Sequence, residues 1–237
     1  MQDTDNIIAK NKWQFDEDVT AVFDNMLERS IPQYEIMRSL CEKIGANYVK
    51  PDTYIIDVGC SNGRAIEPFY RRFKGHNKFI GVEISDPMIE AAKKRFSGEN
   101  DICIYKQNIV DKVADIKMQS ASLILSVLTV QFTPIEYRQK IISEIYDLLD
   151  NNGAFIFVEK VLGNTYSIDR TLVKEYYGIK AEHQYTQEQI MAKRKSLEGV
   201  LVPLTAKWNE NLLKEAGFKQ IDCFWRCLNF AGWIAIK

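Results

Sequence analysis

The chain has 237 residues, of which 46% are apolar, 11% aromatic and 27% charged. This is the composition of an ordinary globular protein, and it excludes a disordered chain, a collagen and a disulfide miniprotein. Its 31 Lys and Arg residues against 32 Asp and Glu residues give a formal net charge of −1, so no overall positive field would attract a phosphate backbone. A nucleic-acid partner is therefore not expected.

The cysteines and the N-terminal residues bear on location. Five cysteines are scattered along the chain and the segment 1–12 is polar and charged, which predicts a reduced, cytoplasmic protein without a signal peptide. No apolar run reaches the roughly 18 residues of a membrane helix, so a membrane partner is not expected. With only two histidines, neither of them near Cys223 and Cys227, no metal site is expected.

In chain order, apolar residues recur first at helical spacing from Val19 to Leu27, and a second helical stretch follows, which predicts a helical N-terminal cap over residues 1–45. Short β-branched runs then alternate with amphipathic segments. Strands are expected at 54–59, 78–83, 102–105, 121–127 and 153–159, with helices at 65–72, from 86 onward and at 134–149.

Residues 162–202 return to a polar helical pattern, which predicts a helical lid insertion. A helix at 209–216 follows, and strands at 218–221 and 229–236 are expected to form an antiparallel C-terminal edge. The alternation predicts a single α/β domain over residues 1–237, with a Rossmann-like, doubly wound, mostly parallel seven-stranded sheet.

A glycine-rich turn follows the first predicted strand. Its sequence runs from Asp57 through Gly59, Cys60 and Ser61 to Gly63, at the place where an open α/β sheet binds its ligand. The turn lacks the lysine of a P-loop and the three-glycine spacing of a dinucleotide fingerprint. Glu83 ends the second strand, where a carboxylate can accept hydrogen bonds from both ribose hydroxyls.

This combination resembles the class I S-adenosylmethionine-dependent methyltransferases, and the resemblance implies S-adenosyl-L-methionine as cofactor. Asn108 at the third strand end and Val127 at the fourth fall where that family contacts adenine and methionine. An aromatic face near the sulfonium would stabilise its charge, and Tyr34 or Trp13 is the candidate, although Trp13 is more simply a packing residue.

A longer set of residues is similar to one branch, the carboxy-S-adenosylmethionine synthases. It includes Trp13-x-Phe15-Asp16-Glu17, Arg29-Ser30-x-Pro32-x-Tyr34, Gly59-Cys60-Ser61, Thr129-x-Gln131-Phe132, Glu159-Lys160, Lys193-Arg194 and Cys227-x-Asn229-Phe230. Those enzymes join the carboxylate of prephenate to the cofactor for the modification of a tRNA wobble uridine. The resemblance places the cofactor at Tyr34, Asp57, Gly59, Cys60, Ser61, Gly63, Glu83, Ile84, Asn108, Ile109 and Val127, with Asn108 in place of an aspartate and Val127 in place of an asparagine.

One departure decides between two functions. The resemblance implies a carboxylate-binding arginine in the helix after Pro203, five residues before Phe218 of the Gly217-Phe218 pair, where this chain has Leu213. A buried carboxylate without its cationic partner costs about 3 to 5 kcal/mol, or roughly a hundredfold or more in affinity. The sequence therefore favours plain in-line methyl transfer from S-adenosylmethionine to a small-molecule acceptor. Lys193 or Arg194 could instead reach the same place.

Two alternatives stay open: carboxy-S-adenosylmethionine synthase itself, which uses prephenate and would hold carboxy-S-adenosyl-L-methionine, and a non-catalytic cofactor-binding partner. Weak candidates for a catalytic base are Tyr185, His183 and Glu159, and candidates for substrate binding are Arg194, Tyr176 and Tyr177. The Lys193-Arg194-Lys195 run is more often a solvated helix face than an anion clamp. A homodimer is implied by the resemblance alone.

Overall fold

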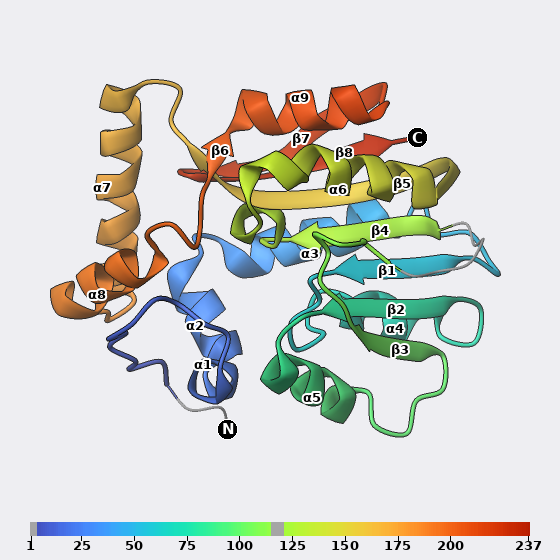
Figure 1. Ribbon diagram of the computed structural model, residues 1–237, viewed down its shortest axis with the longest axis horizontal. Coiled ribbons are helices and arrows are strands. Elements are labelled where there is room, and N and C mark those ends of the chain that lie inside the picture. Colours follow the sequence, from blue (N-terminus) through green and yellow to red (C-terminus); the bar gives the residue numbers. More distant parts are fainter. Residues whose placement is uncertain (1–3, 115–120) are drawn as a thin grey trace.

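The computed structural model describes residues 4–114 and 121–237, which fold around one twisted sheet (Figure 1). Its strands are β1 (Tyr54–Val58), β2 (Lys78–Glu83), β3 (Ile102–Lys106), β4 (Ala121–Val127), β5 (Leu149–Leu162), β6 (Leu204–Thr205), β7 (Gln220–Cys227) and β8 (Phe230–Ile236). The order is β3-β2-β1-β4-β5-β8-β7, with β1 to β5 parallel and β8 antiparallel to both neighbours. The predicted fold class is confirmed. The two-residue β6, which pairs with β5, adds an eighth strand to the seven expected.

Successive residues of a strand point to opposite faces of the sheet, and here the residues on both faces are apolar. Helices therefore cover both faces. Ile55 is fully buried on the face packed by α3 (Tyr34–Gly45) and α4 (Glu67–Phe73). Its neighbour Ile56 is equally buried on the face packed by α6 (Ile135–Leu148) and α9 (Ala206–Ala216). α5 (Asp86–Arg95) lies beside β3. Its N-cap is Ser85, whose hydroxyl accepts a hydrogen bond from the Met88 N–H.

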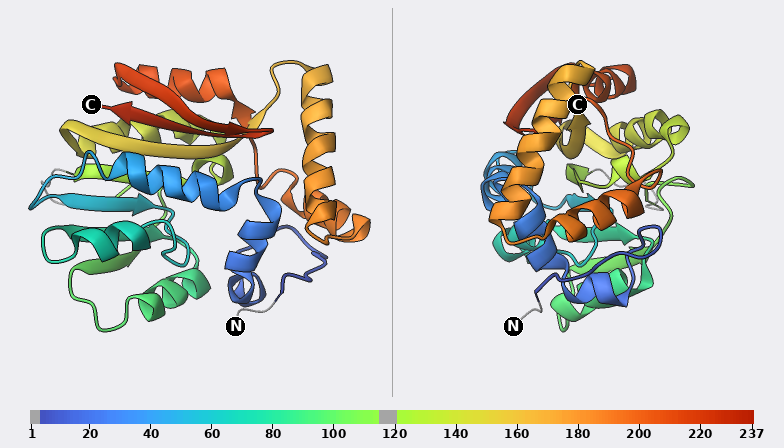
Figure 2. Two further views of the ribbon diagram at one scale, coloured as in Figure 1. Left: turned by 180° about the vertical axis from the view of Figure 1, so that it is seen from behind. Right: turned by 90° about the vertical axis from the view of Figure 1, so that its left-hand side faces the viewer.

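The remaining helices gather at the carboxyl ends of the parallel strands (Figure 1). They are α1 (Glu17–Ala21), α2 (Phe23–Ser30), the short η1 (Val130–Phe132), α7 (Tyr166–Glu182) and α8 (Gln187–Leu197). Figure 2 shows α7 standing across this end of the sheet, with α8 folding back toward the N-terminal helices. Within the predicted cap the helices begin at Glu17, residues 4–16 form no helix, and residues 1–3 lie outside the described residues. The predicted lid contains α7 and α8. No described helix is both long enough and apolar enough to span a bilayer.

Candidate active site

The turn after β1 has the backbone that its glycines permit. Gly59 has a φ of 75° and Gly63 a φ of 82°, both in the left-handed region. The N–H groups of Gly59 and Cys60 donate to the Val82 carbonyl at 2.8 and 3.0 Å, which fixes the turn to β2. A Cβ on Gly59 would lie 2.1 Å from the side chain of Thr129, so the turn has no space for a side chain there.

Glu83 is held in place by three backbone donors. One carboxylate oxygen accepts the Ser61 N–H at 2.9 Å, and the other accepts the N–H groups of Ile84 and Ser85 at 2.8 and 2.9 Å. The carboxylate is therefore fixed between the glycine turn and the start of α5. Its position is the one expected of a group that binds ribose hydroxyls.

An apolar cavity lies over the glycine turn, and part of the predicted cofactor set lines it. These residues are Tyr34, Gly59, Cys60, Ser61 and Val127. The cap, η1 and the lid line the cavity with side chains that include Trp13, Phe15, Phe23, Phe132 and Leu197. Both aromatic candidates for the sulfonium, Tyr34 and Trp13, are thus in this lining.

The rest of the predicted cofactor set lies outside that lining. Gly63 is in the glycine turn itself. Ile84 is 57% exposed, and Asn108 is exposed with its Oδ1 accepting the Val110 N–H at 3.1 Å. Glu83 and Ile109 are buried, so the predicted nucleoside end of the site combines buried and exposed side chains.

The buried carboxylate of Asp57 bears on whether the site fits such a cofactor. Its carboxylate is buried at the end of β1 and has no hydrogen-bond partner among the described residues. Burial, reinforced by the nearby charge of Glu83, raises its pKa to about 7. A buried carboxylate with so little compensation is costly, and S-adenosylmethionine carries an ammonium group. Asp57 lines neither cavity, so its charge fits this cofactor through its place beside the glycine turn and not through a contact in the lining.

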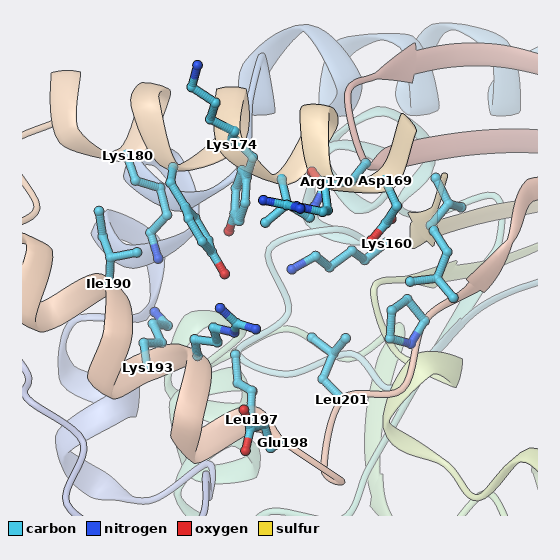
Figure 3. A pocket seen from close by; sticks show the side chains of 18 of the residues that line it. Lys160, Asp169, Arg170, Lys174, Lys180, Ile190, Lys193, Leu197, Glu198 and Leu201 are labelled. Carbon is cyan, nitrogen blue, oxygen red and sulfur yellow. The ribbon is translucent and has the colours of Figure 1, made fainter. Parts of the chain in front are cut away.

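A second, larger cavity of about 710 Å³ lies between α7 and α8 (Figure 3). We call it the basic cavity because six cationic side chains line it against two carboxylates. The cations are Lys160, Arg170, Lys174, Lys180, Lys193 and Arg194, and the carboxylates are Asp169 and Glu198. In a chain with a net charge of −1, this excess makes the cavity locally positive.

Helix geometry brings these side chains together. Val173, Tyr176, Tyr177 and Lys180 recur at spacings of three and four residues, so one face of α7 lines the cavity. A capping box, in which the Thr186 hydroxyl accepts the Gln189 N–H and Gln189 accepts the Thr186 N–H, fixes the start of α8. Lys193 and Arg194 follow two turns later on α8.

The two cavities share a wall. Five residues line both, namely Lys160, Tyr176, Lys193, Leu197 and Leu201. Figure 3 shows Lys160 extending toward the middle of the basic cavity and Lys180 and Lys193 lying together at one end. The basic cavity and the apolar cavity are therefore adjacent.

Burial lowers the pKa values of the three lysines deepest in this region. The pKa of Lys180 falls to about 7, where the charges of Lys193 and Lys160 add to the effect of burial. Burial likewise lowers the pKa of Lys160 and of Lys193 to about 8, although Asp5, 3.7 Å from the Lys193 ammonium, opposes the shift at Lys193. A bound anion would restore the charged form of each.

The predicted substrate-binding residues Arg194, Tyr176 and Tyr177 all line the basic cavity. Arg194 lies against Tyr177, where its charge opposes the rise that burial causes in the pKa of that phenol. The sequence favours a solvated helix face for residues 193–195. This is wrong for Lys193, whose side chain is only 13% exposed. Lys195 is exposed and does not line the cavity.

The three candidate bases lie outside the linings of both cavities. His183 is exposed at the end of α7, with its Nδ1 2.9 Å from the Arg29 carbonyl. Tyr185 is buried and its hydroxyl is hydrogen-bonded to Asp5 and Ser30. Glu159 is buried and accepts the Val130 N–H at 3.0 Å, and burial raises its pKa to about 8. Each side chain therefore has a structural partner.

The structure corrects the expectation that position 213 belongs to the ligand site. It is fully buried on α9, in the hydrophobic core between that helix and the sheet, and lines neither cavity. An arginine at this position would enter the core instead of a ligand site. The absence of arginine at 213 is therefore no reason to exclude a carboxylated ligand, and Arg194 supplies a guanidinium at the basic cavity.

The sequence analysis does not name Lys160 or Lys180 as candidate ligand-binding residues. A signal for Lys160 is present, because it follows the apolar core of β5 at the carboxyl edge of the sheet, where ligands bind in this class of fold. Lys180 shares a helix face with Tyr176 and Tyr177.

Comparison with known proteins agrees with this geometry. A family described as "Methyltransferase domain" matches residues 55–153. The chain is 35% identical over 224 residues to the carboxy-S-adenosyl-L-methionine synthase of Methylococcus capsulatus, covering 94% of this chain and 93% of that protein. It is 36% identical over 230 residues to the Wolinella succinogenes protein of the same name, covering 96% and 95%. The chain belongs to the carboxy-S-adenosyl-L-methionine synthase family.

Solved structures agree at the level of the fold. The CurJ carbon methyltransferase matches with a TM-score of 0.66 at 12% identity, over 94% of this chain and 61% of that one. Human N-acetylserotonin methyltransferase in complex with SAM matches with a TM-score of 0.54 at 16% identity, over 92% and 58%. Together with the family, these confirm the predicted class, an S-adenosylmethionine-dependent enzyme on the methyltransferase fold.

Proposed function

We propose that this protein is a carboxy-S-adenosyl-L-methionine synthase that uses prephenate as the carboxyl donor. The observation that carries the proposal is the basic cavity, which has six cationic residues in its lining and shares five lining residues with the apolar cavity. Prephenate is a dianion, and a cavity with a surplus of cations favours such a donor over a neutral methyl acceptor. The names of the relatives support the same function.

The overall reaction balances without a further reagent. Prephenate loses its ring carboxyl group and its ring hydroxyl and becomes phenylpyruvate. S-adenosylmethionine gives up one proton from its S-methyl group and receives the carboxyl carbon there, and the proton and the hydroxide leave as water. The sulfonium keeps its three carbon substituents, so no S-adenosylhomocysteine forms.

The chain's own residues would supply binding and orientation. Glu83 would bind the ribose, Asp57 fits the ammonium group, and Tyr34 and Trp13 offer aromatic faces to the sulfonium. Arg194 and the lysines of the basic cavity would bind the two carboxylates of the donor. Holding the two molecules on either side of one wall replaces a bimolecular encounter with an oriented pair.

Plain methyl transfer is the second candidate. The sequence argument for it depends on Leu213, which lies in the core and lines neither cavity. It also gives no role to the surplus of cations. A binding protein without catalysis is the third candidate, and it predicts neither carboxylated product nor S-adenosylhomocysteine.

One experiment separates the three. Purified protein is incubated with S-adenosylmethionine and prephenate, and both carboxy-S-adenosylmethionine and S-adenosylhomocysteine are quantified by mass spectrometry. The proposal expects the carboxylated product in an amount equal to the phenylpyruvate formed, with no S-adenosylhomocysteine above a protein-free control. S-adenosylhomocysteine as the main product, or no product at all, would contradict it.

A further inference from the structure

Lys160 occupies a position that the other cationic side chains do not share. It lies on β5, it lines both cavities, and its ammonium extends toward the middle of the basic cavity (Figure 3). Lys193 also lines both cavities, but its ammonium is 3.7 Å from the buried Asp5. Arg194 lines the basic cavity alone.

The Lys160 ammonium has no carboxylate within ion-pair distance in the described ranges 4–114 and 121–237. Its neighbours are aromatic faces, with the Tyr176 ring centre 4.8 Å and the Phe230 ring centre 5.8 Å from the nitrogen. Asp169 on α7 influences its pKa, but that carboxylate accepts the Gly163 N–H at 2.7 Å. A largely enclosed cation without an anionic partner costs stability, which is expected of a group kept for a ligand.

The backbone holds Lys160 rigidly. Its N–H donates to the Gln131 side chain at 2.8 Å, and it pairs with Phe230 of β8 in the antiparallel register. Gln131 lines the apolar cavity, so this hydrogen bond connects the backbone of Lys160 to the wall of that cavity. A cation on a paired strand is placed more precisely than one on a loop.

We propose that Lys160 is a catalytic residue that holds the carboxyl group during its passage from the donor to the S-methyl carbon. This inference rests on the proposed function. The bond between the donor's ring carbon and its carboxyl carbon breaks, its electron pair enters the ring, and the ring expels hydroxide. The carboxyl carbon is then carbon dioxide, which bonds to the S-methyl carbon as that carbon's proton joins the hydroxide to give water.

The Lys160 ammonium binds an oxygen of the carboxyl group before, during and after this passage. It therefore keeps the carbon dioxide at the junction of the two cavities and stabilises the carboxylate as it forms again. Without the ammonium, carbon dioxide can leave through the open basic cavity. The donor is then consumed without carboxylation.

The test compares Lys160→Met with Lys160→Arg and with Lys174→Met, a control that removes a cation lining the basic cavity alone. Lys160→Met is expected to lower kcat about 100-fold or more, to change the Kd of S-adenosylmethionine by less than threefold, and to yield less than one carboxylated product per phenylpyruvate. Lys160→Arg is expected to recover part of the kcat. The Lys174 ammonium points away from the centre of the cavity (Figure 3), so Lys174→Met is expected to change kcat and the KM for prephenate by less than threefold and to keep the product ratio at one.

Thermal unfolding shows whether Lys160 is only structural. Methionine fills a similar volume between the rings of Tyr176 and Phe230, so Lys160→Met is expected to have an equal or higher Tm. A kcat within threefold of wild type, a product ratio of one in Lys160→Met, or a lower Tm with loss of S-adenosylmethionine binding would overturn the assignment. A wild-type protein that makes no carboxylated product would overturn the proposed function, and the role of Lys160 with it.

Discussion

The three lysines with lowered pKa values make donor binding depend on pH. An anionic donor requires charged ammonium groups, and burial holds the pKa of Lys180 at about 7 and those of Lys160 and Lys193 at about 8. As the pH rises through this range the free enzyme loses these charges, so the KM for prephenate should increase from pH 7 to pH 9. Steady-state kinetics across this range check the prediction, and a constant KM would contradict it.

The same shifts predict how the stability of the ligand-free protein depends on pH. The ordinary pKa of lysine is near 10.5, so between pH 7 and 10 the unfolded chain binds more protons than the folded one. The free energy of unfolding should therefore rise with pH over this range, as far as these groups contribute. Lys180→Met should flatten that rise, because Lys180 has the lowest pKa of the three. Denaturant titrations of both proteins at several pH values measure the slopes.

At the cofactor side, Glu83→Gln should weaken S-adenosylmethionine binding about 10- to 100-fold, because hydrogen bonds to a charged group contribute about 1.5 to 3 kcal/mol. Glutamine keeps the size of the side chain but loses the charge and turns one acceptor into a donor. The matched control is Glu90→Gln on the solvent side of α5, whose side chain is 72% exposed. Calorimetry should show an unchanged Kd for the control, and an equal Kd in both variants would remove Glu83 from the site.

The residues of the site differ in how far the sequence could predict them. The glycine turn and Glu83 were predictable because β1 and β2 are adjacent and each ligand-facing residue ends its own strand. The basic cavity was not, because its cations come from β5, α7 and α8, and only the packing of α7 against α8 shows which of them converge. Asp5 is the extreme case, since it meets Tyr185 across 180 positions of sequence.

At the level of elements, the N-terminal segment holds α8 in place over the apolar cavity. The Trp13 N–H donates to the Ser196 carbonyl at 3.0 Å, and Asp5 contacts both the Tyr185 hydroxyl and the Lys193 ammonium. Asp5 is only 2% exposed, so these contacts exclude water. The contacts of this segment therefore help to place the helix that carries Lys193 and Arg194.

Asp5→Asn should therefore loosen α8. Removing one partner of a buried ion pair leaves Lys193 without compensation, and we expect faster hydrogen exchange in α8 and a loss of about 2 to 4 kcal/mol in the free energy of unfolding. Asp18→Asn, at an exposed site on α1, is the control. Unchanged exchange in residues 187–197 of Asp5→Asn would show that the segment does not hold the helix.

The elements themselves were predicted well where their periodicity is strong. β1, β2 and β4 have the expected bounds to within a residue, whereas β5 runs on to Leu162 beyond its apolar core. That extension carries Lys160 to the edge of the site, and its pairing with β6 and β8 sustains it. Local propensity does not contain such long-range pairing, so the sequence alone ended the strand too early.

At the scale of the whole molecule, positive charge is concentrated at the basic cavity. The chain as a whole has a net charge of −1, yet the basic cavity holds six cations and two carboxylates. Such a local field should steer an anionic donor but not the cofactor, whose own net charge is not negative. The homodimer implied by the resemblance remains a prediction that light scattering in solution would check.

Ionic strength tests this distribution of charge. Raising the salt concentration from about 50 mM to about 500 mM shortens the Debye length severalfold, so kcat/KM for prephenate should fall several-fold while the Kd of S-adenosylmethionine changes little. Parallel kinetics and calorimetry in the two buffers provide the comparison. An equal response of both ligands would mean that the field of the basic cavity does not act on the donor.

In the proposed reaction one carbon atom passes from prephenate to the S-methyl carbon of S-adenosylmethionine, and an isotope label can follow it. Prephenate labelled with carbon-13 in its ring carboxyl group is incubated with the protein and unlabelled S-adenosylmethionine, and the nucleosides are analysed by mass spectrometry. The label is expected in the new carboxyl group of carboxy-S-adenosylmethionine. Unlabelled nucleosides, with all of the label released as carbon dioxide or left in prephenate, would contradict it.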